Sequence, residues 1–474
     1  MSVLIRGGQV IDGTGAKARR ADVRIQNDKI SEVKPSLKPQ PGETTIDAGG
    51  RVVTPGFIDA HSHADGGIFE DSNAETQIRQ GITTSVVGQD GGNNYPLGEW
   101  FAKLAAARPA LNFASFVGHG TVRGRVLGKD YKRKATPAEI QAMRALVAQE
   151  MKAGALGLSS GLEYEPGLFS DTNEIVALAE VAATYKGIYI SHVRDEEDGA
   201  LESFKELISI AERARIPAQI SHIKLGSAPV WGKTGMVFDL LAAAKKRGLD
   251  ISVDLYPYTY WQSGLVTIFE GQEWSNVAQW EKAIKGIGGA QQIRITGYAP
   301  EPTWVGKTLD ELAREQKKSA PQLASDMVIA AKGGVGVVVT AMQESDLEAF
   351  MRYPRVMFCT DGGLHGSHPR GAGSYPRVMG RYVRERHVLS LEEAVRKATS
   401  LPASRFGLKG RGVLAPGNVA DLVLFDPLRI NDTSTVQNPR SAPVGLGDVF
   451  VSGVHTLKNG QPTGQHGGRA LRRA

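Results

Sequence analysis

Two histidines one residue apart follow a short apolar run and offer a pair of nitrogen ligands. The run contains Phe57 and Ile58, and His61 and His63 come directly after it. On a strand, residues two apart face the same side, so both imidazoles can converge on one point just past the strand's carboxyl end. Taken alone, the pair fits a hydrogen-bonded core better than a metal site. The rest of the chain decides between them.

The same arrangement recurs at three later points, where a polar residue stands at the end of a β-branched run. These are His192 after 187–191, His222 after 218–221 and Asp361 after 356–359. In a barrel of parallel strands all of these ends open onto one face. Imidazole nitrogens with carboxylate oxygens make an open site for zinc or a similar divalent ion. Four histidines in register with the barrel therefore favour a shared metal site over separate local hydrogen bonds.

The elements that would position these residues are short strands alternating with helical patterns, which indicate a parallel sheet wrapped by helices. Strands are expected at the His61 run and at 83–87, 112–117, 155–158, 187–191, 218–221, 250–254 and 356–359. Helices are expected after Thr136 and after Asp171 or Thr172, which serve as caps. This pattern favours an α/β fold with a (β/α)8 TIM-like barrel. Two further strand-like runs, 293–296 and 335–339, leave the last two barrel strands open to reassignment.

Both ends of the chain have the short strands and turns of an all-β unit. We therefore expect a small β-sandwich domain formed from both chain termini, with residues 1–53 as its N-terminal part and 411–474 as its C-terminal part. The barrel would occupy residues 54–410.

The bulk properties exclude several classes of partner. The net charge is +6, but lysines and arginines are scattered, so no nucleic-acid partner is expected. The single cysteine excludes an intramolecular disulfide framework and a cysteine-based zinc finger. No apolar run approaches 18 residues and no signal peptide is visible, so we expect a cytoplasmic protein with no membrane partner.

Ten stretches together resemble the amidohydrolase superfamily and, within it, the N-acyl-D-amino-acid deacylases (D-aminoacylases). They are residues 56–63, 81–84, 117–120, 154–167, 191–196, 221–224, 254–258, 360–362, 368–377 and 416–426. The resemblance spans nearly the whole chain. It implies a metal-dependent enzyme that hydrolyses an amide bond, with deacylation of a small N-acyl-D-amino acid to a carboxylate and a D-amino acid as the expected reaction. It leaves open whether the protein is an oligomer.

Carried over to this chain, the resemblance implies a tightly bound metal held by His192 and His222. A second, weaker metal position would be formed by His61 and His63. Asp361 would be the general base.

One site position departs from the family pattern. Deacylases of this branch have Gly-Asn-Cys-Gly where this chain has Gly88-Gln-Asp90-Gly91, so Asp90 would stand in for a thiolate ligand. One or two ions are expected, zinc first, but a carboxylate is harder than sulfur and could move the preference toward manganese, cobalt or iron. Glu163 is a second-choice metal ligand. Alternatively, Asp90 only caps the turn at Gly91.

Several other residues carry weaker expectations. Tyr164, Lys224 and Arg377 lie in matching motifs and are expected to bind the substrate carboxylate or carbonyl. Residues 262–305 are expected to form a lid that selects the acyl group. Three sets of residues fit a structural interpretation at least as well: His119 as a buried hydrogen-bonded residue, Cys359 as core, and 195–198 as a solvated helix start.

Two other functions stay open. One is a different amidohydrolase reaction, such as dipeptide, cyclic imide or amide-toxin hydrolysis. The other is a non-catalytic barrel that binds without cleaving.

Overall fold

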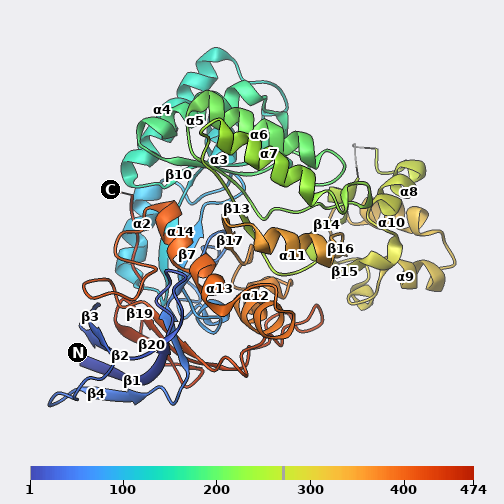
Figure 1. Cartoon of the computed structure of the whole chain (residues 1–474). Coiled ribbons are helices and arrows are strands. Elements are labelled where there is room, and N and C mark those ends of the chain that lie inside the picture. Colours follow the sequence, from blue (N-terminus) through green and yellow to red (C-terminus); the bar gives the residue numbers. More distant parts are fainter. Residues whose placement is uncertain (1, 270–272, 474) are drawn as a thin grey trace.

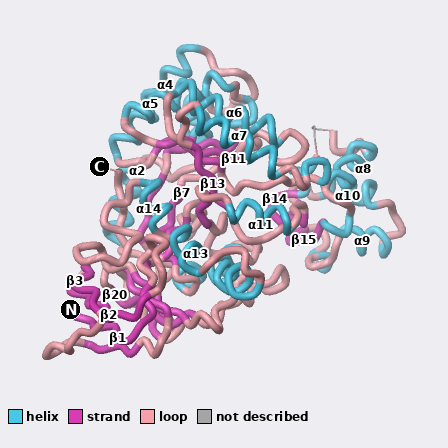
Figure 2. The backbone as a smooth tube through the Cα atoms, viewed as in Figure 1, coloured by secondary structure: helices cyan, strands magenta, loops and turns pink. Residues whose placement is uncertain are grey.

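The computed structural model describes residues 2–269 and 273–473. A closed barrel with helices around it forms the centre, a sheet built from both chain ends lies on one side, and an inserted lobe projects from the other (Figure 1). Residues 270–272 of the predicted lid lie outside the described residues. Figure 2 shows the barrel strands enclosed by helices.

The barrel is closed by hydrogen bonds between two parallel sheets. Their strands are β6 (Phe57–Asp59), β7 (Ile82–Val87) and β8 (Asn112–Ser115), then β9 (Val117–Gly118), β10 (Gly157–Gly161), β11 (Ile188–His192), β12 (Ala218–Ile220), β13 (Ile251–Leu255) and β17 (Val356–Phe358). Phe116 alone separates β8 from β9, so these two strands act as one and the barrel has eight. Ala60 donates to the Phe358 carbonyl and joins the first strand to the last. The predicted fold class is confirmed.

Helices follow most of the strands and cover the outside of the barrel. They are α1 (Glu75–Ile78), α2 (Leu97–Ala107), α3 (His119–Leu127), α4 (Pro137–Ala153), α5 (Thr172–Thr184), α6 (Ala200–Ala214), α7 (Thr234–Lys246), α11 (Glu344–Arg352), α12 (Arg370–Arg377), α13 (Leu391–Ala398) and α14 (Ser400–Phe406). Thr136 caps α4, as the sequence predicts, and it also forms a capping box with Glu139. Asp171 caps α5.

Strands from both ends of the chain pair in one nine-stranded sheet. It contains β1 (Ser2–Val10), β2 (Arg19–Gln26), β3 (Lys29–Lys34), β4 (Thr44–Asp47), β5 (Val52–Pro55), β18 (Leu422–Phe425), β19 (Leu446–Val451), β20 (Val454–Lys458) and β21 (Gln461–Pro462). The two halves meet where β5 pairs antiparallel with β18. Because β5 ends at Pro55 and β6 begins at Phe57, the chain passes directly from this sheet into the barrel.

An inserted lobe separates β13 from α11 (Figure 1). Its elements are β14 (Tyr260–Gly264), α8 (Val277–Gly286), β15 (Ile293–Tyr298), α9 (Leu309–Glu315), α10 (Ala320–Ala330) and β16 (Val335–Thr340). The runs at 293–296 and 335–339 belong to its antiparallel sheet, β14-β16-β15, and not to the barrel. The lobe thus extends beyond the predicted 262–305.

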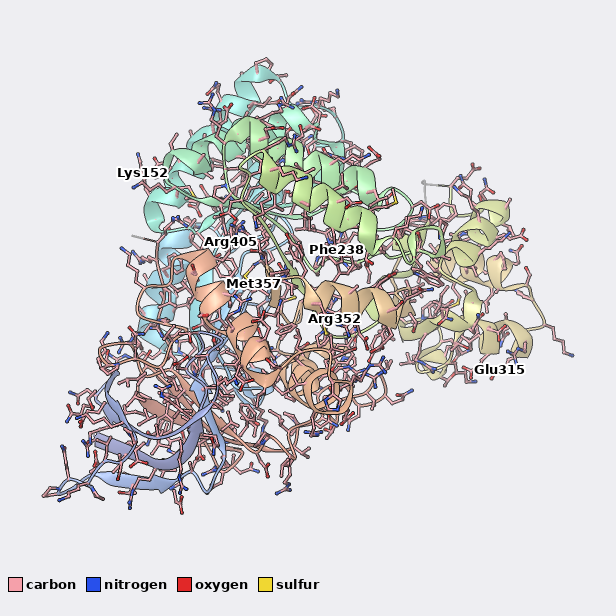
Figure 3. All side chains as sticks on the ribbon, in the orientation of Figure 1. Lys152, Phe238, Glu315, Arg352, Met357 and Arg405 are labelled. Atoms are coloured by element: carbon pink, nitrogen blue, oxygen red, sulfur yellow. The ribbon has the colours of Figure 1, made fainter. Side chains whose placement is uncertain are left out.

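The interior of the barrel and the outer end of the lobe differ sharply in exposure. In Figure 3, Met357 on β17 lies in the centre of the molecule, whereas Glu315 stands at the far end of the lobe. Cys359 is buried and unpaired, as expected of a core residue. No helix in the described part of the chain has the length and apolar character needed to span a bilayer.

Candidate metal centre

The predicted metal ligands and the predicted base Asp361 meet at the carboxyl ends of the barrel strands. They come from six strand ends: His61 and His63 after β6, Asp90 after β7, Glu163 after β10, His192 at the end of β11, His222 after β12 and Asp361 after β17. Apart from His61, which is fully buried, they line one cavity of about 250 Å³. This is the face on which the active sites of such barrels lie.

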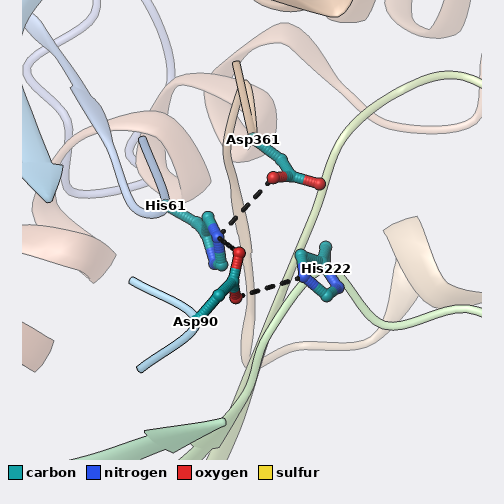
Figure 4. A group of neighbouring side chains, drawn as sticks. All are labelled: His61, Asp90, His222 and Asp361. Atoms are coloured by element: carbon teal, nitrogen blue, oxygen red, sulfur yellow. Dashed lines mark hydrogen bonds and ion pairs between the residues drawn. The ribbon is translucent and has the colours of Figure 1, made fainter. Parts of the chain in front are cut away.

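Three of these residues have a backbone conformation that only a well-packed surrounding tolerates. The φ angles are 52° at Asp90, 30° at His222 and 47° at Asp361, all in the left-handed region. Each such residue costs about 1–3 kcal/mol and typically persists where function requires it. The strain turns the chain sharply at the strand ends and points the three side chains toward one another (Figure 4).

The first group of ligand atoms surrounds one oxygen of Asp90. Its Oδ2 lies 3.3 Å from Nε2 of His61 and 3.1 Å from Nε2 of His63. Asp361 completes the group, with Oδ1 3.6 Å from the His61 nitrogen and 3.3 Å from that of His63.

The second group consists of two imidazoles that face each other. Nδ1 of His192 lies 3.0 Å from Nε2 of His222, and that His222 nitrogen lies 3.5 Å from Oδ1 of Asp90. The remaining nitrogens meet carboxylates: His192 Nε2 is 2.5 Å from Glu163, and His222 Nδ1 is 3.0 Å from Glu196. Ligand histidines typically have their second nitrogen fixed in this way. Glu163 thus contacts the nitrogen of His192 that does not face His222.

The charges around the cluster favour a cation. Burial lowers the pKa of His222, but Glu196, Asp361 and Asp90 outweigh it and raise the pKa to about 10. Burial likewise opposes protonation of His63, yet Asp361 and Asp90 raise its pKa well above the usual value. The surrounding carboxylates thus favour positive charge at His222 and at His63. A divalent ion would supply this charge in place of the protons on the two imidazoles. The imidazole and carboxylate set therefore fits a metal such as zinc.

The chain resembles known proteins over nearly its whole length. The model of the amidohydrolase family matches residues 44–463. The chain belongs to the amidohydrolase family. This amidohydrolase is 34% identical to the D-aminoacylase of Alcaligenes xylosoxydans xylosoxydans, over 99% of this chain and 97% of the relative. It is also 34% identical to an N-acyl-D-glutamate deacylase of that organism, over 100% of this chain and 97% of the relative.

The solved structures agree with the sequence relatives. An N-acyl-D-glutamate deacylase from Bordetella bronchiseptica, complexed with zinc and a phosphonate inhibitor that mimics the tetrahedral intermediate, superposes with a TM-score of 0.89. It is 32% identical, and the match covers 99% of both chains. The predicted resemblance to this family is confirmed.

The amidohydrolase cavity also contains two cationic side chains. Lys224 pairs with Glu196, and its Nζ lies 2.8 Å from Nδ1 of His222. Arg370 lies 2.6 Å from Oδ2 of Asp361 and stacks over Tyr256 with 4.6 Å between the guanidinium carbon and the ring centroid. Tyr164 is placed beside His192, with its hydroxyl 3.4 Å from Nδ1.

Arg377 is not brought to the cavity. It pairs with Asp432 at 3.0 Å and donates to the Pro257 carbonyl at 2.8 Å. His119 also lies elsewhere, with Nε2 2.8 Å from Glu174. Both residues therefore tie segments of the fold together.

Two site residues were missed by sequence reasoning. The prediction of a solvated helix start at 195–198 is wrong for Glu196, which is only 13% exposed and contacts His222 and Lys224. Its position four residues after His192, just past a strand end, is the signal that could have found it. Arg370 lies in the matching 368–377 stretch, where only Arg377 was singled out.

Proposed function

We propose that this amidohydrolase is a metal-dependent deacylase that hydrolyses N-acyl-D-amino acids to a carboxylate and a D-amino acid. The observation that carries the proposal is a cavity lined by His63, His192, His222, Asp90, Asp361 and two cationic side chains, with His61 buried against Asp90 and Asp361. The D-aminoacylase relatives support the D configuration and the linear amide. An N-acyl-D-amino acid is a small molecule, and the enzyme would encounter it in the cytoplasm, the location expected from the sequence.

His192 and His222 would hold the tighter ion, and His61 and His63 the second, with Asp90 as a ligand between them. When bound, a divalent metal polarises the scissile carbonyl and lowers the pKa of a coordinated water toward neutrality. Zinc suits this donor set first, and the carboxylate of Asp90 leaves manganese, cobalt and iron as alternatives.

Asp361 would accept the proton of the attacking water. Burial opposes its ionisation, but Arg370, together with His222 and His63, holds the pKa of this carboxyl well below its usual range. The carboxylate is therefore ionised at neutral pH, which is the form that can take up a proton. As the C–N bond breaks, Asp361 returns the proton to the leaving amine nitrogen, so one residue acts as base and then as acid.

Arg370 and Lys224 would bind and orient the substrate. The planar guanidinium of Arg370 matches a carboxylate, and its stacking on Tyr256 fixes the plane of that fork. Tyr164, at the His192 end of the cavity, can donate its hydroxyl proton to the carbonyl oxygen.

The test is a panel of N-acetyl-D-amino acids and their L enantiomers, assayed with enzyme reconstituted with zinc, manganese or cobalt. We expect hydrolysis of at least one D substrate and a clear preference over its enantiomer. Hydrolysis of dipeptides or cyclic imides without any N-acetyl-D-amino acid turnover would contradict the proposal.

A further inference from the structure

We propose that the preferred substrates are N-acyl-D-amino acids with a long apolar acyl chain, and that this chain binds in a second, larger cavity next to the metal centre. The inference deepens the proposed function and rests on it, because it concerns the substrate of the same site. The larger cavity has a volume of about 850 Å³, compared with about 250 Å³ for the cavity lined by the predicted metal ligands. Pockets that take whole organic ligands typically measure about 300–1,000 Å³.

The two cavities share a wall. The residues that line both of them are Glu163, Tyr164, Glu197 and Thr267. Arg370 and Lys224 line only the smaller cavity. In the proposed function Tyr164 donates to the carbonyl oxygen of the substrate, whereas Arg370 binds its carboxylate. The carbonyl carbon would then lie at the shared wall, and the acyl chain attached to it would lead into the larger cavity.

Two segments of the chain give the larger cavity an apolar lining. One is the loop after β10, and the other is the inserted lobe around α8. The apolar side chains include Leu168, Phe169, Ile268, Phe269, Trp274 and Ile287. Leu168 remains 45% exposed, so a ligand can still cover apolar surface there. This lining suits an alkyl chain.

The charged residues of the larger cavity are engaged within the protein. Arg194 pairs with Glu206 at 3.0 Å, and the carboxylate of Asp198 accepts a hydrogen bond from Ser227 at 2.7 Å. Asp195 accepts the backbone N–H groups of Glu197 and Gly199. The apolar lining, rather than these charges, is therefore left to select the ligand.

The experiment compares N-acetyl-D-alanine with N-octanoyl-D-alanine as substrates of the metal-loaded enzyme. Each methylene of the longer chain that becomes buried favours binding by roughly fourfold. We therefore expect kcat/KM to be at least about tenfold higher for the octanoyl substrate. The readout for all variants is the ratio of these two values of kcat/KM, the octanoyl-to-acetyl ratio.

Gly286→Phe fills part of the larger cavity. Gly286 is the last residue of α8 and lines the cavity. A Cβ on it would meet none of the described heavy atoms within 4 Å, and its φ lies outside the left-handed region, so the backbone tolerates a side chain there. The octanoyl-to-acetyl ratio should fall by about tenfold. Gly235→Phe is the matched control, since a Cβ on Gly235 in α7 is equally free and this residue lines neither cavity.

Leu168→Asp is a second variant, which places a charge in the apolar lining and should also lower the octanoyl-to-acetyl ratio. Its control is Val305→Asp, at an exposed apolar position of the lobe that does not line the cavity. An unchanged ratio in both Gly286→Phe and Leu168→Asp would overturn the proposal. A loss confined to hydrolysis of N-acetyl-D-phenylalanine in these variants would assign the larger cavity to the amino-acid side chain, and would also overturn it.

Binding measurements separate this inference from the proposed function. Asp361→Asn, which should not turn over either compound, is titrated with both in a calorimeter, with and without Gly286→Phe. Tighter binding of the octanoyl compound that is lost with Gly286→Phe would support the chain site even if the unaltered enzyme hydrolysed neither compound, which would overturn only the proposed function. Hydrolysis of N-acetyl-D-alanine without any preference for the octanoyl compound, in rate or in binding, would overturn only the inference.

Discussion

The backbone N–H of Asp361 donates to the carbonyl of His61 over 2.9 Å, and the carboxylate of Asp361 lies 3.6 Å from the imidazole of His61. Asp361 follows the last barrel strand and His61 follows the first. The hydrogen bond that helps to close the barrel thus also places the proposed base beside a proposed ligand.

Replacing Asp361 by Asn should abolish turnover while folding and metal content stay close to those of the unaltered protein. The amide keeps the shape of the side chain but cannot take up a proton, and general acid–base groups contribute about 10²- to 10⁴-fold in rate. The measurements are kcat, metal content and thermal midpoint. Activity within a few-fold of the unaltered enzyme would rule out this role.

His192→Ala and His222→Ala should each lose bound metal together with activity. Each substitution removes one of the two imidazoles that face each other across 3.0 Å. Metal analysis after purification is the measurement, and His119→Gln is the control, since His119 is a buried histidine that pairs with Glu174 outside the cavity. Full metal content in both alanine variants would place the binding site elsewhere.

Two arginines at opposite ends of α12 should behave differently. Arg370→Ala should raise KM by roughly 10- to 150-fold, the loss expected for a charged hydrogen bond of about 1.5–3 kcal/mol. Arg377→Ala should leave KM nearly unchanged and lower stability by about 1–3 kcal/mol, because it leaves Asp432 without this partner. Steady-state kinetics and urea unfolding distinguish the two, and the opposite pattern would reassign the carboxylate site to Arg377.

The buried imidazole of His368 should lower the free energy of unfolding in mild acid. Burial, followed by Arg370, holds its pKa well below 6.5, and its ring bonds to the Tyr260 carbonyl and the Arg370 amide. Below pH 6.5 the unfolded chain takes up a proton at His368 that the folded protein does not. The free energy of unfolding therefore falls by about 1.4 kcal/mol for each unit by which the pH is lowered. Urea unfolding between pH 5 and 7 should show a shallower pH dependence for His368→Gln. Equal slopes would show that His368 does not carry this effect.

The barrel strands and the histidines could be predicted because both depend on local pattern. His61, His63, His192 and His222 each follow a short apolar run, and parallel strands bring such ends together whatever lies between them. Strands β15 and β16 could not be separated from barrel strands by composition. What distinguishes them is antiparallel pairing with β14, which is a long-range contact.

The site positions of Glu196 and Arg370 could not be predicted from the local sequence, because they depend on long-range contacts. The run at 195–198 has the composition of a solvated helix start, but Glu196 is buried beside Lys224 and His222, which follow the next strand. Arg370 and Arg377 lie at the two ends of one short helix. Which end faces the cavity is decided by the placement of α12 against the barrel, and no spacing in the sequence records it.

Removal and return of metal test the central claim most directly. Enzyme stripped with a chelator should lose hydrolysis of an N-acetyl-D-amino acid, and stoichiometric zinc, manganese or cobalt should restore it, because the bound metal is proposed to polarise the carbonyl and to lower the pKa of the attacking water. Metal content measured in parallel should rise with activity. Undiminished hydrolysis by protein shown to be free of metal would contradict the account.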